Sequence, residues 1–235
     1  MQIIKKLYLL MLLNIFLFGL NAVNAQSEFQ VSSGVNNSNF FKPNIFNASV
    51  WDKFNGKNSY LVELSYLETM NNGNKNGFML EHIHRKVHSS VLYDNGNTEE
   101  INWSMYFINF HYVYEKQLFS VNNFRISIPI APYVGYCAWC CEKGAWKWRN
   151  IILNPIYECY SNKIWELNLG ISTGLNFQYY FNDHFSILLH SDIEIDFVAP
   201  VSTDDWTITR IFVVTTGIAY NLSNGLNVFQ KKSKK

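Results

Sequence analysis

Charged residues are scarce in this chain. Asp, Glu, Lys and Arg make up 16% of its 235 residues, against about 25% in ordinary soluble domains. The 19 Lys and Arg nearly balance the 18 Asp and Glu, so the formal net charge is only +1. Proteins that bind nucleic acid neutralise phosphates with a surplus of basic residues. We therefore expect no nucleic-acid partner.

The chain also lacks a long apolar run after residue 25. No later window reaches the roughly 18 consecutive apolar residues that indicate a transmembrane helix. With 12 glycines, only 5 prolines and abundant asparagine, the sequence predicts many turns. We therefore expect no spanning helix in the mature protein.

The first 25 residues have the pattern of an export signal. Lys5 and Lys6 form a basic start, Leu7 to Leu20 form an apolar run, and Val23-Asn24-Ala25 matches a small-residue cleavage site. The run is shorter than the roughly 20 residues of a membrane-spanning helix, so we favour cleavage after Ala25 over a membrane anchor. No cysteine follows the run, which disfavours a lipid-anchored lipoprotein.

Two segments near the C-terminus alternate strictly between apolar and polar residues. One face of the first carries Trp165, Leu167, Leu169, Ile171, Thr173, Leu175, Phe177 and Tyr179. A run of this length exceeds the 5 to 6 residues usual in globular strands and suits a tilted membrane-spanning strand. In the second, Ile187, Leu189, Ile193, Ile195 and Phe197 oppose Ser186, His190, Asp192, Glu194 and Asp196. Both segments indicate strands with one lipid-facing side.

The same rhythm predicts eight strands. We expect them at about 28 to 36, 58 to 70, 77 to 92, 101 to 117, 124 to 138, 163 to 180, 185 to 198 and 206 to 222. Short connections (71–76, 120–123, 182–184) alternate with long ones (37–57, 139–162), as in outer-membrane barrels. The predicted fold is all-β, an eight-stranded antiparallel transmembrane β-barrel with short periplasmic turns and longer outer loops. Residues 1–25 would be the signal, 26–223 the barrel and 224–235 a basic tail that contains Lys231, Lys232, Lys234 and Lys235.

Aromatic residues are expected to form two girdles at the membrane surfaces. All seven tryptophans fall toward the proposed outer side: Trp51, Trp103, Trp139, Trp146, Trp148, Trp165 and Trp206. The opposite strand ends carry Tyr66, Tyr112, Tyr114, Phe177, Tyr179, Phe185 and Tyr220. A soluble sandwich also contains aromatic strand residues, but it gives no reason for every tryptophan to lie on one side.

The strand rhythm and two segments resemble a known family. The segments are Ile126-Ser127-Ile128-Pro129-Ile130-Ala131-Pro132-Tyr133-Val134-Gly135-Tyr136 and Thr215-Thr216-Gly217-Ile218-Ala219-Tyr220-Asn221-Leu222. They resemble the small PorT-like outer-membrane β-barrels of Bacteroidetes, and the second resembles the signal read by the barrel-assembly machinery. The resemblance implies a cell outer membrane location and a part in export or surface assembly. In the family the chain stops at an aromatic residue at the end of the last strand, whereas here thirteen further residues follow Leu222.

An eight-stranded barrel is narrow enough for side chains to fill it, so we expect a packed polar interior rather than an open pore. The residues expected to face inward are Glu63, Arg125, Ser127, Glu166, Asn168, Asn176, Gln178, His190, Asp192, Glu194 and Asp196. Acids outnumber bases in this set. Either some carboxylates are protonated or bases such as Arg85 supply the balance.

Two alternative functions remain open. The first is an outer-membrane lipid or peptide hydrolase, in which His190 with Asp192 or Glu194 activates a water or hydroxyl group. Ser191 would face lipid and cannot be its nucleophile. The second is a soluble periplasmic β-barrel that carries an apolar ligand, with Leu169, Ile171, Leu175 and Ile193 facing inward. The favoured reading is a structural or surface-interaction barrel that is not an enzyme.

All four cysteines, Cys137, Cys140, Cys141 and Cys159, lie in or beside the longest outer loop. In an exported chain an even number indicates disulfides. Because Cys140 and Cys141 are adjacent, we expect each to pair with Cys137 or Cys159. Zinc binding by these cysteines is the weaker reading, since no ordered second pair accompanies them.

The stapled loop would present an aromatic and cationic surface, formed by Trp139, Trp146, Lys147, Trp148 and Arg149. Its role is either to anchor in lipid headgroups or to recognise a glycan, lipid or protein. His82 and His84 share a strand face but lack a third ligand at a diagnostic spacing, so we expect no metal and no cofactor. The expected partners are outer-membrane lipid and the export and barrel-assembly machinery.

Overall fold

The structure is a computed structural model that describes residues 26–41, 54–92, 97–148, 151–160, 167–199 and 207–222. These residues form nine strands and no helix. The strands are β1 (Gln26–Phe41), β2 (Phe54–Thr69), β3 (Lys75–Leu92), β4 (Asn97–Val121), β5 (Phe124–Trp148), β6 (Ile151–Tyr160), β7 (Leu167–Tyr180), β8 (Phe185–Ala199) and β9 (Thr207–Asn221). None of these residues belongs to a helix long and apolar enough to cross a membrane.

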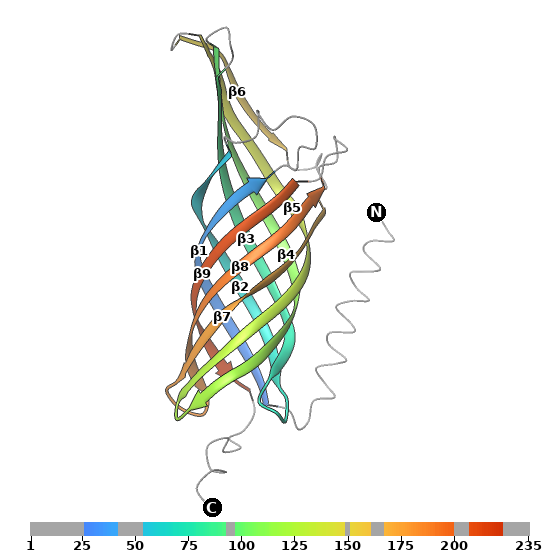
Figure 1. Ribbon diagram of the computed structural model, residues 1–235, viewed down its shortest axis with the longest axis vertical. Coiled ribbons are helices and arrows are strands. Elements are labelled where there is room, and N and C mark those ends of the chain that lie inside the picture. The colour runs from blue at the N-terminus through green and yellow to red at the C-terminus, as the bar shows by residue number, and fades with distance from the viewer. Residues whose placement is uncertain are drawn as a thin grey trace, which may run out of the picture.

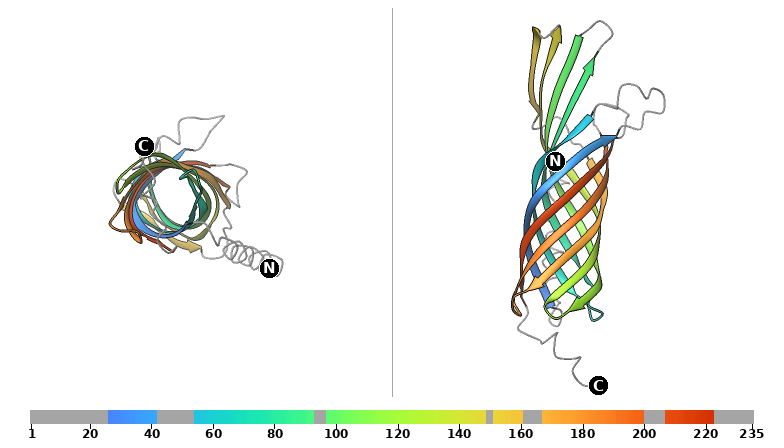
Figure 2. Two further views of the ribbon diagram at one scale, coloured as in Figure 1. Left: turned by 90° about the horizontal axis from the view of Figure 1, so that it is seen from below. Right: turned by 60° about the vertical axis from the view of Figure 1, so that its left-hand side comes forward.

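Eight of the strands close into an antiparallel barrel. Strand β1 pairs with β2 on one side and with β9 on the other, so that Val31 lies opposite both Leu64 and Ile218. The order continues through β2, β3, β4, β5, β7, β8 and β9. The view along the barrel axis shows the closed ring (Figure 2). Closure leaves these eight strands without an unpaired edge along the barrel wall, as a membrane-spanning sheet requires.

Side chains alternate between the two faces of the barrel wall. On β8, Asp192, Glu194 and Asp196 point inward and are buried, while Ile193 and Ile195 are exposed on the outside. The period of two places successive residues on opposite faces of a strand. The interior is therefore polar and the exterior apolar, the reverse of a soluble barrel.

Three short turns lie at one end of the barrel, which we call the turn end (Figure 1). They join β2 to β3, β4 to β5, and β7 to β8. Gly73 has φ +82°, a conformation that costs glycine little, and Asn122 has φ 50°, which asparagine tolerates better than most residues. The turn chemistry fixes which residues of each hairpin lie opposite one another.

Strands β4 and β5 are each 25 residues long and project at the opposite, outer end, where β3 stays paired with β4 as far as Leu92 opposite Thr98. There β6 pairs with the last part of β5, with Cys141 opposite Cys159. The projecting parts of β3, β4 and β5 together with β6 form what we call the outer extension, which rises above the barrel mouth (Figure 2). Much of the connection 139–162, which the sequence predicts as a loop, is thus folded as strand.

The eight predicted barrel strands are confirmed, with different ends. The two strands with the least regular pattern, 77–92 and 101–117, are present as β3 and β4. The predicted strand starts 163 and 206 lie outside the described residues, as do the signal segment 1–25 and the tail 224–235.

Candidate functional site

The interior of the barrel is built in layers of paired polar groups. Nearest the turn end, the ammonium of Lys75 contacts both carboxylate oxygens of Glu28 at 2.9 and 2.8 Å and donates to Gln178 Oε1 at 2.8 Å. Gln178 in turn donates to Glu28 and to Ser186. These groups come from β1, β3, β7 and β8, so the layer ties opposite walls of the barrel together.

A second set of pairs joins neighbouring strands. Glu115 on β4 accepts a hydrogen bond from Ser127 on β5 and lies 3.4 Å from the Arg125 guanidinium. Glu81 on β3 accepts a 2.6 Å hydrogen bond from Asn109 and lies 3.3 Å from His111 Nε2. Buried carboxylates are costly unless they are paired in this way.

The largest buried side chain in the described interior is Arg85, on β3. Its guanidinium lies 2.7 Å from Asp196 and 4.3 Å above the ring of Phe107. Tyr133 donates to the same Asp196 carboxylate at 3.2 Å. This confirms that a base of the third strand offsets inward carboxylates, as the sequence suggested for Arg85.

The predicted inward set is confirmed for the residues that the structure describes. Glu63, Arg125, Ser127, Asn168, Asn176, Gln178, Asp192, Glu194 and Asp196 are buried in the interior, and His190 faces inward and is partly buried. Glu166 lies outside the described residues. The sequence reading did not name Glu28, Lys75, Glu81, His111 and Glu115, although the alternation of their strands would have placed them on the same face.

The candidate hydrolytic residues His190, Asp192 and Glu194 share the inner face of β8. No hydrogen bond between any two of them is present in the described part of the chain. Ser191 is exposed on the outer face, as predicted. A reacting group would have to reach these side chains inside the barrel, where Asp192 and Glu194 are buried.

Toward the outer end, apolar side chains join the polar ones in the interior. Buried residues of β2, β3, β4, β5 and β9 pack into one cluster: Leu61, Ile83, Val87, Met105, Phe107, Cys137, Cys140, Ile211 and Val213. We call this cluster the apolar plug. Trp103 packs against it. The plug lies beside the Arg85–Asp196 pair, because Ile83 and Val87 flank Arg85 on the inner face of β3 and Ile211 and Val213 lie opposite Glu194 and Asp192. Close-packed side chains therefore fill this part of the interior.

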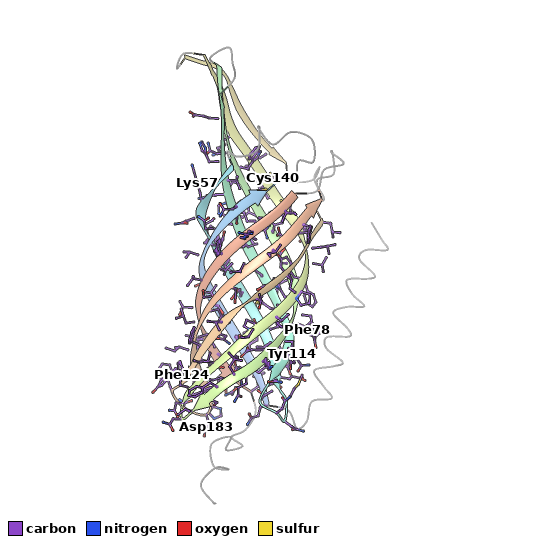
Figure 3. The ribbon with its side chains drawn as sticks, viewed as in Figure 1. Lys57, Phe78, Tyr114, Phe124, Cys140 and Asp183 are labelled. Atoms are coloured by element: carbon purple, nitrogen blue, oxygen red, sulfur yellow. A yellow bond between two sulfur atoms is a disulfide. The ribbon has the colours of Figure 1, made fainter. Side chains whose placement is uncertain are left out.

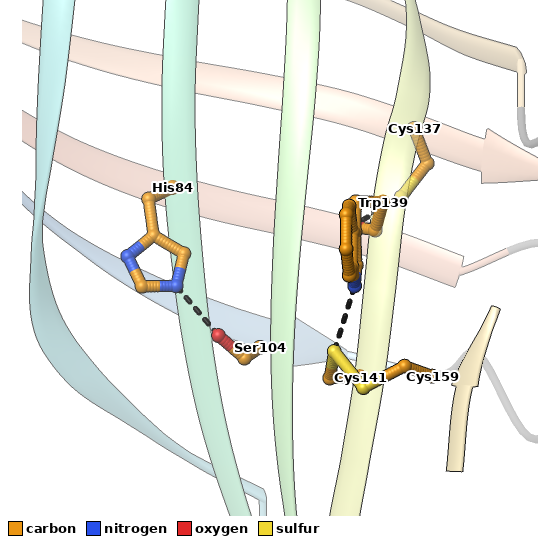
Figure 4. Close-up of a disulfide and its surroundings, with 6 residues drawn as sticks. All are labelled: His84, Ser104, Cys137, Trp139, Cys141 and Cys159. Carbon is orange, nitrogen blue, oxygen red and sulfur yellow. Dashed lines mark hydrogen bonds between the residues drawn. A yellow bond between two sulfur atoms is a disulfide. The ribbon is translucent and has the colours of Figure 1, made fainter. Parts of the chain in front are cut away.

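One disulfide, between Cys141 and Cys159, is present in the described residues. It joins β5 to β6 at the base of the outer extension (Figure 4). The sequence predicts a disulfide for each of the adjacent Cys140 and Cys141, and the structure forms only the one of Cys141. Cys137 and Cys140 are not joined to any cysteine. Both are buried in the apolar plug.

Of the predicted loop surface, the structure describes the side chain of Trp139. It is 48% exposed, and its Nε1 donates to Cys141 Sγ at 2.8 Å (Figure 4). The backbones of Trp146, Lys147 and Trp148 belong to the end of β5, and Arg149 lies outside the described residues. The side chains of the first three also lie outside the description.

Apolar and aromatic side chains cover the exterior of the barrel wall. Near the turn end, Tyr112, Phe124, Tyr179, Phe185 and Tyr220 are exposed, and Figure 3 labels Phe124 there. At the outer end Trp139 is exposed, whereas Trp103 points inward to the plug and so does not belong to a lipid-facing girdle. The aromatic girdle is thus seen clearly at the turn end.

Leu169, Ile171, Leu175 and Ile193 face outward, each at least 40% exposed. This contradicts the soluble-carrier alternative, which required them to line the interior. An apolar exterior around a closed, polar-filled barrel is the arrangement of an outer-membrane-type barrel. The chain is a transmembrane β-barrel protein.

His82 and His84 both lie on the outer face of β3, as their spacing predicts. The ring nitrogens of His84 contact Ser59 Oγ at 2.8 Å and Ser104 Oγ at 2.6 Å, and Figure 4 shows the second contact. Its ring is stacked on Tyr106, with centroids 4.2 Å apart. Within the described residues no group of three or more metal-binding side chains is found. The two serine contacts and the stacked Tyr106 ring hold His84 between β2 and β4.

No protein-family model and no curated protein matches the sequence. Solved structures similar to it include Ail, the attachment invasion locus protein of Yersinia pestis, in complex with the heparin analogue sucrose octasulfate. That match has 14% identity and a TM-score of 0.35, and covers 83% of this chain and 99% of Ail.

Two further barrels are similar at the same level. Neisserial surface protein A matches with 8% identity and a TM-score of 0.41, over 82% of this chain and 96% of its own. The outer membrane protein OprG from Pseudomonas aeruginosa matches with 9% identity and a TM-score of 0.39, over 85% and 98%. These likenesses concern the barrel fold and give no ligand or activity to this chain.

Proposed function

We propose that the barrel anchors the outer extension in the outer membrane and displays it for contact with a ligand at the cell surface. The observation that carries this proposal is the length of β4 and β5. A transmembrane strand needs about 9 to 11 residues in the bilayer, whereas each of these has 25. The surplus of β4 is paired with β3 and β5, and the surplus of β5 is also paired with β6 and joined to it by the Cys141–Cys159 disulfide.

The interior supports display over transport or catalysis. Ion pairs such as Glu28 with Lys75 and Arg85 with Asp196 cross the interior. The apolar plug packs beside the second pair, with Ile83 and Val87 on either side of Arg85. An eight-stranded barrel packed in this way has no room for a wide channel.

The proposal also includes the cellular location of the protein, the outer membrane. Residues 1–25 would direct export and be removed after Ala25, and residues 224–235 would lie at the periplasmic end. Kinship with the PorT-like barrels of Bacteroidetes would add contacts with the export and barrel-assembly machinery. The pattern of residues 215–222 supports recognition by that machinery.

Epitope tags test the orientation and the display. A tag inserted between residues 149 and 150, in the connection from β5 to β6, should bind antibody on intact cells. A tag inserted at Gly73, in the turn between β2 and β3, should bind only after the outer membrane is permeabilised. Antibody access to the Gly73 tag alone on intact cells would reverse the orientation and refute display of the extension.

Conductance tests the closed interior. The mature chain, reconstituted in planar bilayers, should show no unitary current steps, because packed side chains fill the barrel. Steps that persist in the mature protein and change in size with Arg85→Ala would show that ions pass through the barrel, and would replace display with transport as the function.

A further inference from the structure

A groove of about 840 Å³ lies on the outside of the barrel near the outer end, over β2, β3, β4 and β5. Figure 3 marks its level by Lys57, near the mouth. The lining residues that matter here are Lys57, His82, Lys86, Tyr106, Trp139 and Lys143. Most of its lining projects from the outer face of the wall and from the base of the outer extension, and Val87 and Trp103 bring it to the edge of the apolar plug.

Cations gather at this groove. The exposed basic residues described on the barrel exterior are Lys57, Lys86, Lys116, Lys143 and Arg210, and three of the five line it. Glu100, two residues from Asn102 on β4, supplies a carboxylate to the same face. The three lysine ammonium groups outnumber this one carboxylate, so the described residues of the groove carry a net positive charge. A positive charge favours an anionic ligand.

The aromatic walls of the groove are held in place before any ligand binds. Tyr106 stacks on His84, which is itself fixed by Ser59 and Ser104. Trp139 is fixed by its hydrogen bond to Cys141, one partner of the disulfide. Preorganised aromatic faces lower the entropy lost on binding, and an exposed indole suits the apolar face of a sugar ring.

Apolar residues lie on the same strands toward the turn end. Leu80 on β3 and Val134 and Tyr136 on β5 are each at least 39% exposed on the outer face. The groove therefore sits at the boundary between the apolar belt and the outer aqueous phase, where lipid headgroups lie. A ligand that fills it would have its anionic part among the lysines and its apolar part along these side chains.

We propose that this groove binds the phosphorylated headgroup of an anionic glycolipid in the outer leaflet. The phosphates contact Lys57, Lys86 and Lys143, a sugar ring covers Trp139, and acyl chains lie over Leu80 and Val134. Lysines near an anionic lipid surface contribute about 1 kcal/mol each. Loss of all three charges should therefore weaken binding roughly a hundredfold.

The test uses the mature chain in phosphatidylcholine nanodiscs that contain 5 mol% diphosphoryl lipid A. Native mass spectrometry measures how much lipid A stays bound. Lys57→Gln/Lys86→Gln/Lys143→Gln should lose it roughly a hundredfold. The matched control Lys116→Gln removes an exposed lysine of the same exterior near the turn end and should bind as the wild type. A shift in gel mobility between unheated and boiled samples confirms that each variant is folded.

A second variant separates charge from packing. Lys57→Arg/Lys86→Arg/Lys143→Arg keeps the charges and should retain lipid A. Wild-type retention by the glutamine variant, or equal loss in Lys116→Gln, would overturn the proposal. A third outcome would also overturn it: the protein does not retain lipid A, but binds soluble heparin through these three lysines. The ligand would then be a soluble polyanion. This proposal rests on the proposed orientation of the barrel, which the epitope tags test separately. Failure of lipid A binding can therefore be distinguished from failure of the display proposal.

Discussion

Arg85 shows how much a single interior side chain supports. It is fully buried and pairs with Asp196 at 2.7 Å. Replacement by methionine keeps much of the volume but leaves the carboxylate buried without its counter-charge. Removal of one partner of a buried ion pair typically costs about 3 to 5 kcal/mol. We expect Arg85→Met to lower the free energy of unfolding by about that amount, measured by urea titration of the protein in lipid vesicles.

Two further variants test the cause of that loss. Arg85→Met/Asp196→Asn removes both charges and should recover part of the stability, because no buried charge is then unpaired. Lys116→Met, on the exposed exterior, should change the stability little. Equal stability of Arg85→Met and the wild type would show that the pair does not contribute.

Gly170 is needed because a ring lies against it. It lies opposite Tyr133 on β5 and Asp196 on β8. A Cβ at this position would overlap the ring and hydroxyl of Tyr133. Gly170→Ala should therefore cost about 1 to 3 kcal/mol in urea unfolding, the range for overpacking of an interior. Gly170→Ala/Tyr133→Ala should cost less than the sum of its two single variants, and an additive result would contradict the contact.

For single residues, the sequence predicts which face of the barrel wall a side chain lies on, but not which side chain it pairs with. The period of two places Asp192, Glu194 and Asp196 on the inner face, and the structure confirms it. The pairs themselves join residues that are distant in the chain, such as Glu28 with Gln178, 150 positions away. Barrel closure brings such residues together, and no local pattern contains that information. The lysines of the outer groove escaped the sequence reading for the same reason.

Among the elements, the outer extension depends on its disulfide. Cys141→Ser removes a crosslink between residues 18 apart in sequence, and such a link is worth about 3 kcal/mol. We expect the barrel to keep its heat-dependent gel mobility while protease cuts the extension roughly a hundredfold faster. Mass spectrometry of the fragments locates the cuts.

Cys140→Ala is the matched control, because this neighbouring residue is buried in the apolar plug and is not part of the disulfide. It should leave the protease resistance of the extension unchanged. If Cys141→Ser resists protease as the wild type does, the pairing with β5 alone holds β6 in place.

The extension was missed as strand because the alternation of β5 changes phase. Tyr133, Gly135 and Cys137 face inward at odd positions, whereas Cys140 faces inward at an even one. Ala138 is the extra residue of a bulge opposite the step from Tyr106 to Phe107. One extra residue moves every later side chain to the other face. A search for a continuous period of two therefore stops at residue 138.

For the whole molecule, the apolar belt predicts where a charge is tolerated. Ile193 faces outward within the belt, and Phe181 is exposed at the turn end. Ile193→Arg should lower the free energy of unfolding from vesicles by about 2 to 4 kcal/mol, and Phe181→Arg by at most about 1 kcal/mol. Equal and small effects at both positions would mean that no lipid surrounds the barrel.

Strand number, strand direction and membrane placement could be predicted because one physical rule repeats in every strand. A lipid solvent outside and packed polar groups inside impose the same alternation throughout the barrel. The choice of ligand obeys no such repeated rule. It depends on a few side chains that meet at one place, such as Lys57, Lys86 and Lys143 from three different strands.

The continuity of β4 and β5 has a mechanical consequence. Each runs without interruption from the turn end to the outer extension, about 80 Å of strand at 3.3 Å per residue. A ligand pulling on the extension would load both strands along their length, with no flexible linker to absorb the force. The hydrogen-bond ladders to β3 and β7 would resist this load in shear, so tension at the cell surface would be shared by the whole barrel wall.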